Sequence, residues 1–152
     1  MKIAISSDHA GYPLKAHVVA YLRDKGHEVL DFGVDSAGHR ADYPDTAAAV
    51  ARTVQKGEAE RGIAICGSGI GVCIAANKFE GIYASIAHDT FSAAQGVEHD
   101  RMNVLCLGAQ IIGTKVAETL VDAFLGAVPL EEDRYLRRFH KVQGFEQGGG
   151  KG

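Results

Sequence analysis

Residues 62–71 read GIAICGSGIG, an apolar run that ends at Cys66 and passes directly into three closely spaced glycines. The run over 62–66 predicts a buried strand, because short continuous apolar stretches bounded by turn residues are typical of parallel sheets. The glycines predict a tight turn, since residues without a Cβ let the backbone bend sharply. A helix is expected next, over about 72–78. A strand that leads through a glycine turn into a helix is the repeating unit of α/β folds.

The same alternation of strand and helix continues along the whole chain. Apolar runs predict strands over 2–7, 27–32, 62–66, 82–87 and 103–107. Helical spacing of apolar residues predicts helices over 11–25, 44–56, 72–78, 89–98 and 114–125, and a last, polar helix over 131–146. Together they predict an α/β fold, a three-layer α/β/α sandwich around a five-stranded parallel Rossmann-like sheet.

Length and composition narrow the class of protein. A chain of 152 residues fits one domain, expected over 1–146, with a glycine-rich flexible tail over 147–152. The net charge of −3 gives no electrostatic reason to expect nucleic acid, and no apolar run is long enough to cross a bilayer. Three cysteines without secretory context predict reduced thiols in the cytoplasm. The histidines and cysteines lack the close spacing of a metal site, so we expect no metal.

Polar residues follow the predicted strands at their carboxyl ends. Asp8 and His9 follow the first strand, Cys66 ends the third, and His88 follows the fourth. Because ligands of open parallel sheets bind outside the carboxyl ends of the strands, this edge is the expected site.

The segment over 66–71 is the richest in chemistry. Amide groups at the start of a helix favour an anion or a developing oxyanion, and Ser68 adds a hydroxyl donor. As a thiolate, Cys66 is suited to abstract a carbon-bound proton or to attack as a nucleophile. A structural glycine turn with a buried cysteine explains the same residues equally well. A dinucleotide-binding fingerprint fails because Val72 stands where it needs glycine.

The other candidates each have an ordinary structural explanation. Asp8 is suited to orient a sugar hydroxyl or to cap the following helix. His99 is suited to acid–base chemistry, or to lie on the surface at a helix end. Arg134 and Arg138 are four residues apart on one helix face, which suits a phosphate clamp or a solvated basic face. Taken singly, the structural explanations are favoured. Two further cysteines, at 73 and 106, are most simply core residues.

Five segments together resemble the ribose-5-phosphate isomerase B family, which includes allose- and galactose-6-phosphate isomerases. They are Asp-His-Ala-Gly at 8–11, Asp-Tyr-Pro at 42–44, Cys-Gly-Ser-Gly-Ile-Gly at 66–71, Ile-Ala-Ala-Asn-Lys at 74–78, and His99 followed four residues later by Asn103. The resemblance covers about residues 2–140 in the family's order and spacing.

The resemblance implies a role for each matching position. Cys66 would be the base that moves a proton between C1 and C2, and His99 of a neighbouring subunit would open the sugar ring. Ser68 and the amides of 69–71 would hold the enediolate oxygen, and Asp8 would assist at the ring oxygen or a hydroxyl. Asn77 would support the glycine loop. The residues implied in substrate binding are His9, Tyr43, Gly67, Gly69, Ile70, Gly71, Asp100, Gln110, Arg134 and Arg138. His9 and the two arginines would bind the phosphate.

The resemblance further implies a homodimer or homotetramer with shared active sites, a phosphorylated sugar substrate, and no cofactor, metal, nucleic-acid or membrane partner. It predicts interconversion of D-ribose 5-phosphate and D-ribulose 5-phosphate. Some relatives use a glutamate base at the position of Val72, which leaves Cys66 as the candidate here.

This sequence departs from the usual family pattern at three places. Gln110 stands where an arginine is usual, Asp100 where an asparagine is common, and residues 132–136 replace the usual lead into the last helix. The first two changes concern the distal end of the substrate. Two alternatives therefore remain: the same chemistry on another aldose, phosphorylated or free, and a non-catalytic sugar-phosphate-binding domain.

Overall fold

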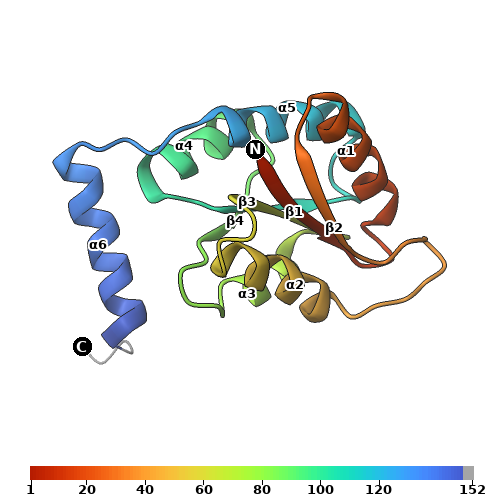
Figure 1. Cartoon of the computed structure of the whole chain (residues 1–152), viewed down its shortest axis with the longest axis horizontal. Coiled ribbons are helices and arrows are strands. Elements are labelled where there is room, and N and C mark those ends of the chain that lie inside the picture. The colour runs from red at the N-terminus through yellow and green to blue at the C-terminus, as the bar shows by residue number, and fades with distance from the viewer. Residues whose placement is uncertain (149–152) are drawn as a thin grey trace.

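Five parallel strands form one sheet in the order β2-β1-β3-β5-β4 (Figure 1). The computed structural model describes residues 1–148. The strands are β1 (Lys2–Ser7), β2 (Glu28–Gly33), β3 (Arg61–Cys66), β4 (Ala84–Ile86) and β5 (Val104–Gly108). The predicted α/β fold with a five-stranded parallel sheet is confirmed.

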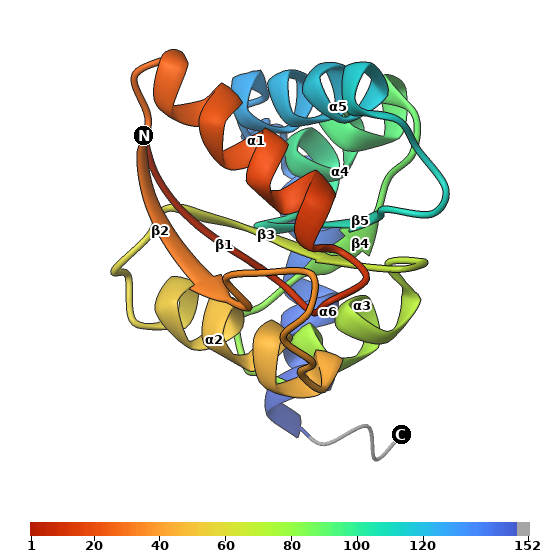
Figure 2. The ribbon, with the colours of Figure 1, turned by 90° about the vertical axis from the view of Figure 1, so that its right-hand side faces the viewer.

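Helices cover both faces of the sheet and make the predicted three layers (Figure 2). Figure 2 shows α1 (Tyr12–Asp24), α4 (Thr90–Asp100) and α5 (Thr114–Gly126) on one face, and α2 (Tyr43–Gln55) and α3 (Ile70–Ala76) on the other. Side chains of β3 alternate between these layers: Ile63 and Ile65 pack with α1, α4 and α5, while Ala64 and Cys66 pack with α2 and α3. This alternation directs Cys66 toward the helix that follows it.

The fourth strand is shorter than the predicted 82–87. β4 spans only Ala84–Ile86, at the edge of the sheet. Just before it, the Tyr83 amide donates to the side chain of Asn103 and the Ala84 amide donates to the side chain of Asn77. Side chains therefore replace ladder partners at this end, and an apolar run alone does not reveal such contacts.

The last helix, α6 (Asp133–Gly148), lies at the β4 side of the molecule, apart from the two layers (Figure 1). It is attached at both ends. Tyr135 stacks on His99 of α4 with ring centroids 4.1 Å apart, and Glu146 accepts bonds from the Tyr83 hydroxyl and the Gly81 amide. The tail predicted over 147–152 lies outside the described residues from 149 onward.

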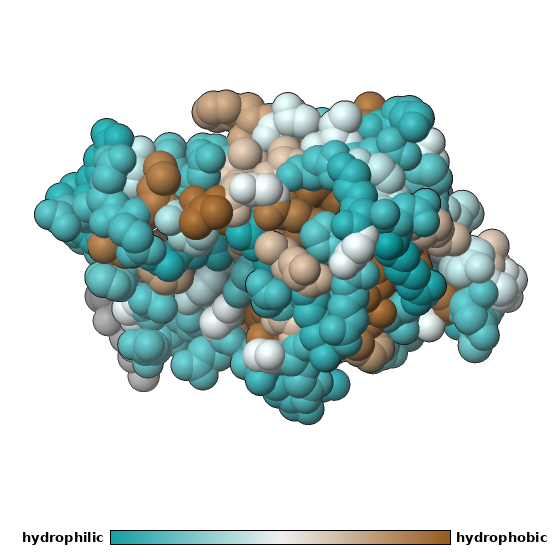
Figure 3. All heavy atoms as spheres, turned by 45° about the horizontal axis from the view of Figure 1, so that its top comes forward, coloured by the Kyte–Doolittle hydropathy of each residue, from teal (hydrophilic) through white to brown (hydrophobic). Residues whose placement is uncertain are grey.

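The surface in Figure 3 is mainly hydrophilic, with separate apolar spots. Large apolar side chains are exposed on α3, at Ile70 and Ile74, and on α6, at Val142 and Phe145. Over residues 1–148, no helix combines the length and the apolar character needed to span a membrane.

Candidate active site

Cys66 ends β3 and is only 5% exposed. Its sulfur accepts a hydrogen bond from the Gly69 amide at 3.1 Å. Gly69 has a φ of +83°, a left-handed conformation that residues with a Cβ rarely adopt. This turn directs the amide back onto the sulfur. The sulfur and this amide are thereby held in a fixed arrangement at the end of β3.

The glycine loop lies directly against the end of β5. A Cβ added at Gly69 would lie 3.1 Å from the carbonyl carbon of Leu107, and one at Gly108 would lie 2.6 Å from the Ser68 oxygen. At Gly67 an added Cβ would meet the Gln110 side chain at 3.2 Å. Close packing of backbones therefore requires glycine at 69 and 108, and the Gln110 side chain lies against the loop at Gly67.

The amides of the loop are divided between protein and solvent. The Ile70 amide donates to Ser68 Oγ at 3.2 Å, and the Gly69 amide donates to Cys66. Two of the amides expected to hold the enediolate are thus engaged with the side chains of Cys66 and Ser68. The next two, of Gly71 and Val72, belong to the first turn of α3, where amides have no intrahelical acceptor.

Tyr43 and the turn over 8–11 complete this edge of the site. The Tyr43 ring packs against Gly71, where an added Cβ would lie 2.7 Å from a ring carbon. Asp8 is buried and accepts a bond from the Gly11 amide at 2.9 Å, so it closes the turn that leads into α1. His9 has its Nδ1 buried without a protein partner among the described residues. Asp8 therefore does not cap α1 in the predicted way, because Gly11 is the N-cap residue and Asp8 closes the turn before it.

His99 and Asp100 lie at the opposite edge of the sheet from Cys66. A helix that connects parallel strands runs from their carboxyl edge back to their amino edge, and these two residues end α4. Arg134 and Arg138 lie on α6, beside the end of α4. Within one chain, the predicted site residues therefore form two separate groups, one around Cys66 and one around His99.

The His99 ring is held in a defined orientation. The Gln95 amide nitrogen lies 2.8 Å from its Nδ1, and Tyr135 stacks on its face. With Gln95 as the donor, the neutral ring carries its proton on Nε2, the other ring nitrogen. Arg134 is engaged on the same helix: its Nε donates to Glu132 at 3.0 Å and another nitrogen donates to the Tyr135 hydroxyl at 2.8 Å.

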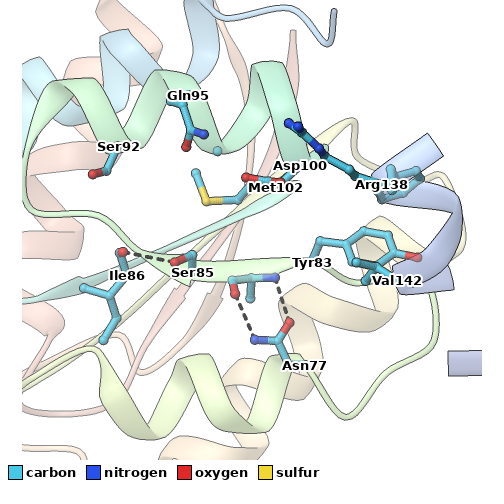
Figure 4. Close-up of a pocket in the computed structure, with 13 residues that line it drawn as sticks. Asn77, Tyr83, Ser85, Ile86, Ser92, Gln95, Asp100, Met102, Arg138 and Val142 are labelled. Carbon is cyan, nitrogen blue, oxygen red and sulfur yellow. Dashed lines mark hydrogen bonds between the residues drawn. The ribbon is translucent and has the colours of Figure 1, made fainter. Parts of the chain in front are cut away.

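A cavity of about 550 Å³ opens between α4, β4 and α6 (Figure 4). Arg138 and Asp100 line it at the α6 end, whereas no residue of the 66–71 loop does. Asn77 lies on its other side and exchanges two hydrogen bonds of 2.8 Å with the backbone of Ala84. The expectation that Asn77 supports the glycine loop is wrong, since it joins α3 to β4 instead.

The sequence placed His88 at the Cys66 edge of the sheet but gave it no role in the site. Its Nε2 accepts a hydrogen bond from the Gly108 amide at 3.1 Å, and burial lowers the pKa of its imidazole. Gly108 is also the β5 partner of Cys66, so His88 and Cys66 flank the same residue. The sequence feature that could have indicated a role for His88 was its position just after β4. Over residues 1–148, no three His, Cys, Asp or Glu side chains gather closely enough to hold a metal ion.

A comparison with protein families agrees with this geometry. Residues 3–142 match the model of the family described as Ribose/Galactose Isomerase. The chain belongs to that family. Ribose-5-phosphate isomerase B of Escherichia coli (strain K12) is 43% identical to this family member over 146 residues, which cover 96% of this chain and 97% of the relative. The D-erythrulose-4-phosphate isomerase of Pectobacterium atrosepticum is 41% identical over 127 residues, 84% of each chain.

The solved structures agree with the family assignment. Ribose-5-phosphate isomerase B of Clostridium thermocellum superposes on this ribose/galactose isomerase with a TM-score of 0.93 at 40% identity, over 97% of this chain and 99% of that one. The resemblance found in the sequence is thereby confirmed. This member of the family is an aldose–ketose isomerase.

Proposed function

We propose that this enzyme interconverts D-ribose 5-phosphate and D-ribulose 5-phosphate through an enediolate, with Cys66 as the base. The observation that carries the proposal is the Gly69 amide 3.1 Å from the Cys66 sulfur, directly before the first turn of α3, whose Gly71 and Val72 amides have no intrahelical acceptor. A thiolate held next to an oxyanion site supplies both the base and the charge stabilisation that the reaction needs.

The proton transfer is balanced within the site. The Cys66 thiolate takes the proton from C2 of the open-chain aldose, and the C2–H electron pair forms the C1–C2 double bond of the enediolate. The former carbonyl oxygen gains negative charge and is stabilised by the Gly71 and Val72 amides and the Ser68 hydroxyl. The Cys66 thiol then returns the proton to C1, while the hydroxyl proton on O2 passes to O1 and the freed O2 electron pair forms the C2 carbonyl, which gives the ketose. Asp8 and Tyr43 line the pocket beside these atoms.

His99 acts from a second copy of the chain in this proposal. In one chain His99 and Cys66 lie at opposite edges of the sheet, so they cannot reach one sugar. The proton on His99 Nε2 is suited to open the ring of a substrate held by a neighbour. Exposed apolar side chains on α3 and α6, among them Ile74 and Phe145, support an assembly of two or four chains.

We assign the phosphate of the substrate mainly to basic side chains that would come from the same neighbouring chain as His99. Arg134 and Arg138 are four residues apart on α6 and would come from the neighbouring chain, whereas His9 would come from the chain that supplies Cys66. Asp100 lies beside Arg138 at the cavity, where it balances part of that positive charge. We place the reaction in the cytoplasm, where the thiol of Cys66 stays reduced.

A second candidate is the same reaction on a shorter sugar phosphate. Gln110 lies against Gly67, close to the reacting sulfur, and presents a neutral amide to the substrate. A relative that is 41% identical is named D-erythrulose-4-phosphate isomerase. The Gln110→Arg variant discriminates between the candidates, since added positive charge should improve turnover of the pentose phosphate if the pocket has changed its preference.

The test is turnover of pentose, tetrose and hexose phosphates and free aldoses by wild type, Cys66→Ala and Cys73→Ser. Loss of a general base typically costs about 10²–10⁴-fold in rate, so we expect Cys66→Ala to be nearly inactive and still folded. Cys73→Ser is the matched control and should retain turnover. Near-normal turnover by Cys66→Ala would exclude Cys66 as the base. Faster turnover of tetrose than of pentose phosphates would replace the first candidate with the second.

A further inference from the structure

All three cysteines of the chain gather on one side of the sheet. Cys66 of β3 and Cys106 of β5 point to the same face, and Cys73 of α3 packs onto it. In the β3–β5 ladder, Cys106 pairs with Ala64, so Cys66 lies two residues further along. The proposed mechanism uses Cys66 and leaves the other two thiols without a role.

Cys73 and Cys106 contact each other across the α3–β5 boundary. Cys106 is fully buried and pairs with Ile86 of β4, and its side chain lies within hydrogen-bonding reach of the Cys73 sulfur. Cys73 is partly exposed, with its sulfur 3.6 Å from the Ala84 carbonyl oxygen and 3.7 Å from the Asn77 amide nitrogen. The pair thus combines one accessible sulfur with one shielded sulfur directly behind it.

The two thiols differ in reactivity. The hydrogen bond from Cys106 lowers the pKa of Cys73 to about 7, so much of it is thiolate at neutral pH. The same bond and burial raise the pKa of Cys106. Thiolate character and exposure decide which cysteine an oxidant attacks, and a neighbouring thiol decides whether the product becomes a disulfide.

We propose that Cys73 and Cys106 are an oxidation site, which a peroxide converts into an intrachain disulfide between α3 and β5. The Cys73 thiolate attacks one oxygen of the peroxide, so that an S–O bond forms and the O–O bond breaks. The leaving oxygen takes up a proton. Cys106 then attacks the sulfenic acid at Cys73: the S–S bond forms, the S–O bond breaks, and the oxygen leaves as water with the Cys106 proton. Two thiols lose two electrons and hydrogen peroxide becomes two waters.

The disulfide acts on the glycine loop through α3. The Cys73 amide bonds to the Gly69 carbonyl at 3.2 Å, and the Gly69 amide bonds to Cys66. Movement of Cys73 toward β5 therefore shifts the turn that holds the Cys66 sulfur. This consequence rests on the proposed function. Small misplacements at a reacting centre cost up to about 100-fold in rate, and we expect a loss of turnover that a dithiol reductant reverses.

The test treats the full-length chain with one equivalent of hydrogen peroxide, blocks free thiols with N-ethylmaleimide, and maps unreduced tryptic peptides by mass. Cleavage after Arg61, Lys78, Arg101 and Lys115 leaves Cys66 and Cys73 together in peptide 62–78 and Cys106 in peptide 102–115. Wild type and Cys66→Ser are compared with Cys73→Ser, a mild change at a partly exposed position.

We expect peptides 62–78 and 102–115 to be linked in wild type and in Cys66→Ser, and separate in Cys73→Ser. A link that survives Cys73→Ser and disappears in Cys66→Ser would overturn the assignment, as would oxidation of Cys73 with Cys106 still free. Unchanged turnover of the disulfide form would overturn the effect on the loop. Peptide mapping needs no turnover, so a chain that forms the disulfide without isomerising sugars would contradict the proposed function alone.

Discussion

At Cys73, the neighbouring thiol rather than the solvent decides reactivity. Because the Cys106 thiol donates to its sulfur, the pKa of Cys73 is lowered to about 7. We expect alkylation of Cys73 by iodoacetamide to reach half of its maximal rate near that pH, while Cys106 stays unmodified in the folded chain. Replacing the donor in Cys106→Ala should move the midpoint toward the ordinary thiol value. The measurement is modification rate against pH by mass spectrometry, and an unmoved midpoint in the variant would contradict the hydrogen bond.

In the proposed site, Glu132 would compete with the substrate phosphate for Arg134. Its carboxylate lies 3.0 Å from Arg134 Nε, and both side chains are 57% exposed. An exposed pair of this kind contributes about 1 kcal/mol or less. In Glu132→Gln we expect the KM of a phosphorylated sugar to fall by about fivefold or less, with kcat retained. Glu131→Gln is the matched control, since Glu131 pairs with Arg101 instead. Equal KM changes in both variants would mean that overall charge, and not Arg134, is responsible.

At the scale of elements, His88 joins the end of β4 to the end of β5. Its Nε2 accepts from the Gly108 amide and must therefore be unprotonated, and burial lowers its pKa below the ordinary 6.5. As pH falls below 6.5 the unfolded chain takes up this proton before the folded chain, so His88 makes stability fall with pH. His88→Gln retains an acceptor and does not titrate.

The measurement is the urea midpoint on either side of pH 6.5 for wild type and His88→Gln. We expect the midpoint of wild type to fall further on acidification than that of the variant. His140→Gln serves as the control, because His140 lies on α6, away from this contact. The prediction fails if the two midpoints fall in parallel.

The succession of elements could be predicted because the buried strands are apolar along their whole length, as parallel strands covered on both faces must be. The edge that holds Asp8 and Cys66 followed from topology alone. The ends of β4 could not be predicted, since Asn77 and Asn103 replace its ladder partners through contacts that leave no local pattern. The position of Gln110 over Gly67 depends on how β3 and β5 align, which composition does not encode.

At the scale of the whole molecule, the direction of the helices places Cys66 and His99 at opposite edges of the sheet. Strands end at the Cys66 edge and helices end at the other, so α4 places His99 at the opposite edge from Cys66, which precedes it in the chain. This separation follows from the parallel topology and holds for any helix that connects two such strands. A second chain is the simplest way to bring the two groups to one sugar.

A shared site predicts that two inactive variants restore each other. Cys66→Ala and His99→Ala should each have very low turnover alone. In a symmetric dimer, a hybrid of the two has one site with both changes and one with neither. After random subunit exchange, half of the dimers are hybrids with one intact site each, which gives about a quarter of wild-type turnover. Exchange is followed by native mass spectrometry with one variant isotopically labelled. Hybrids that form and remain inactive would mean that Cys66 and His99 do not act on one substrate.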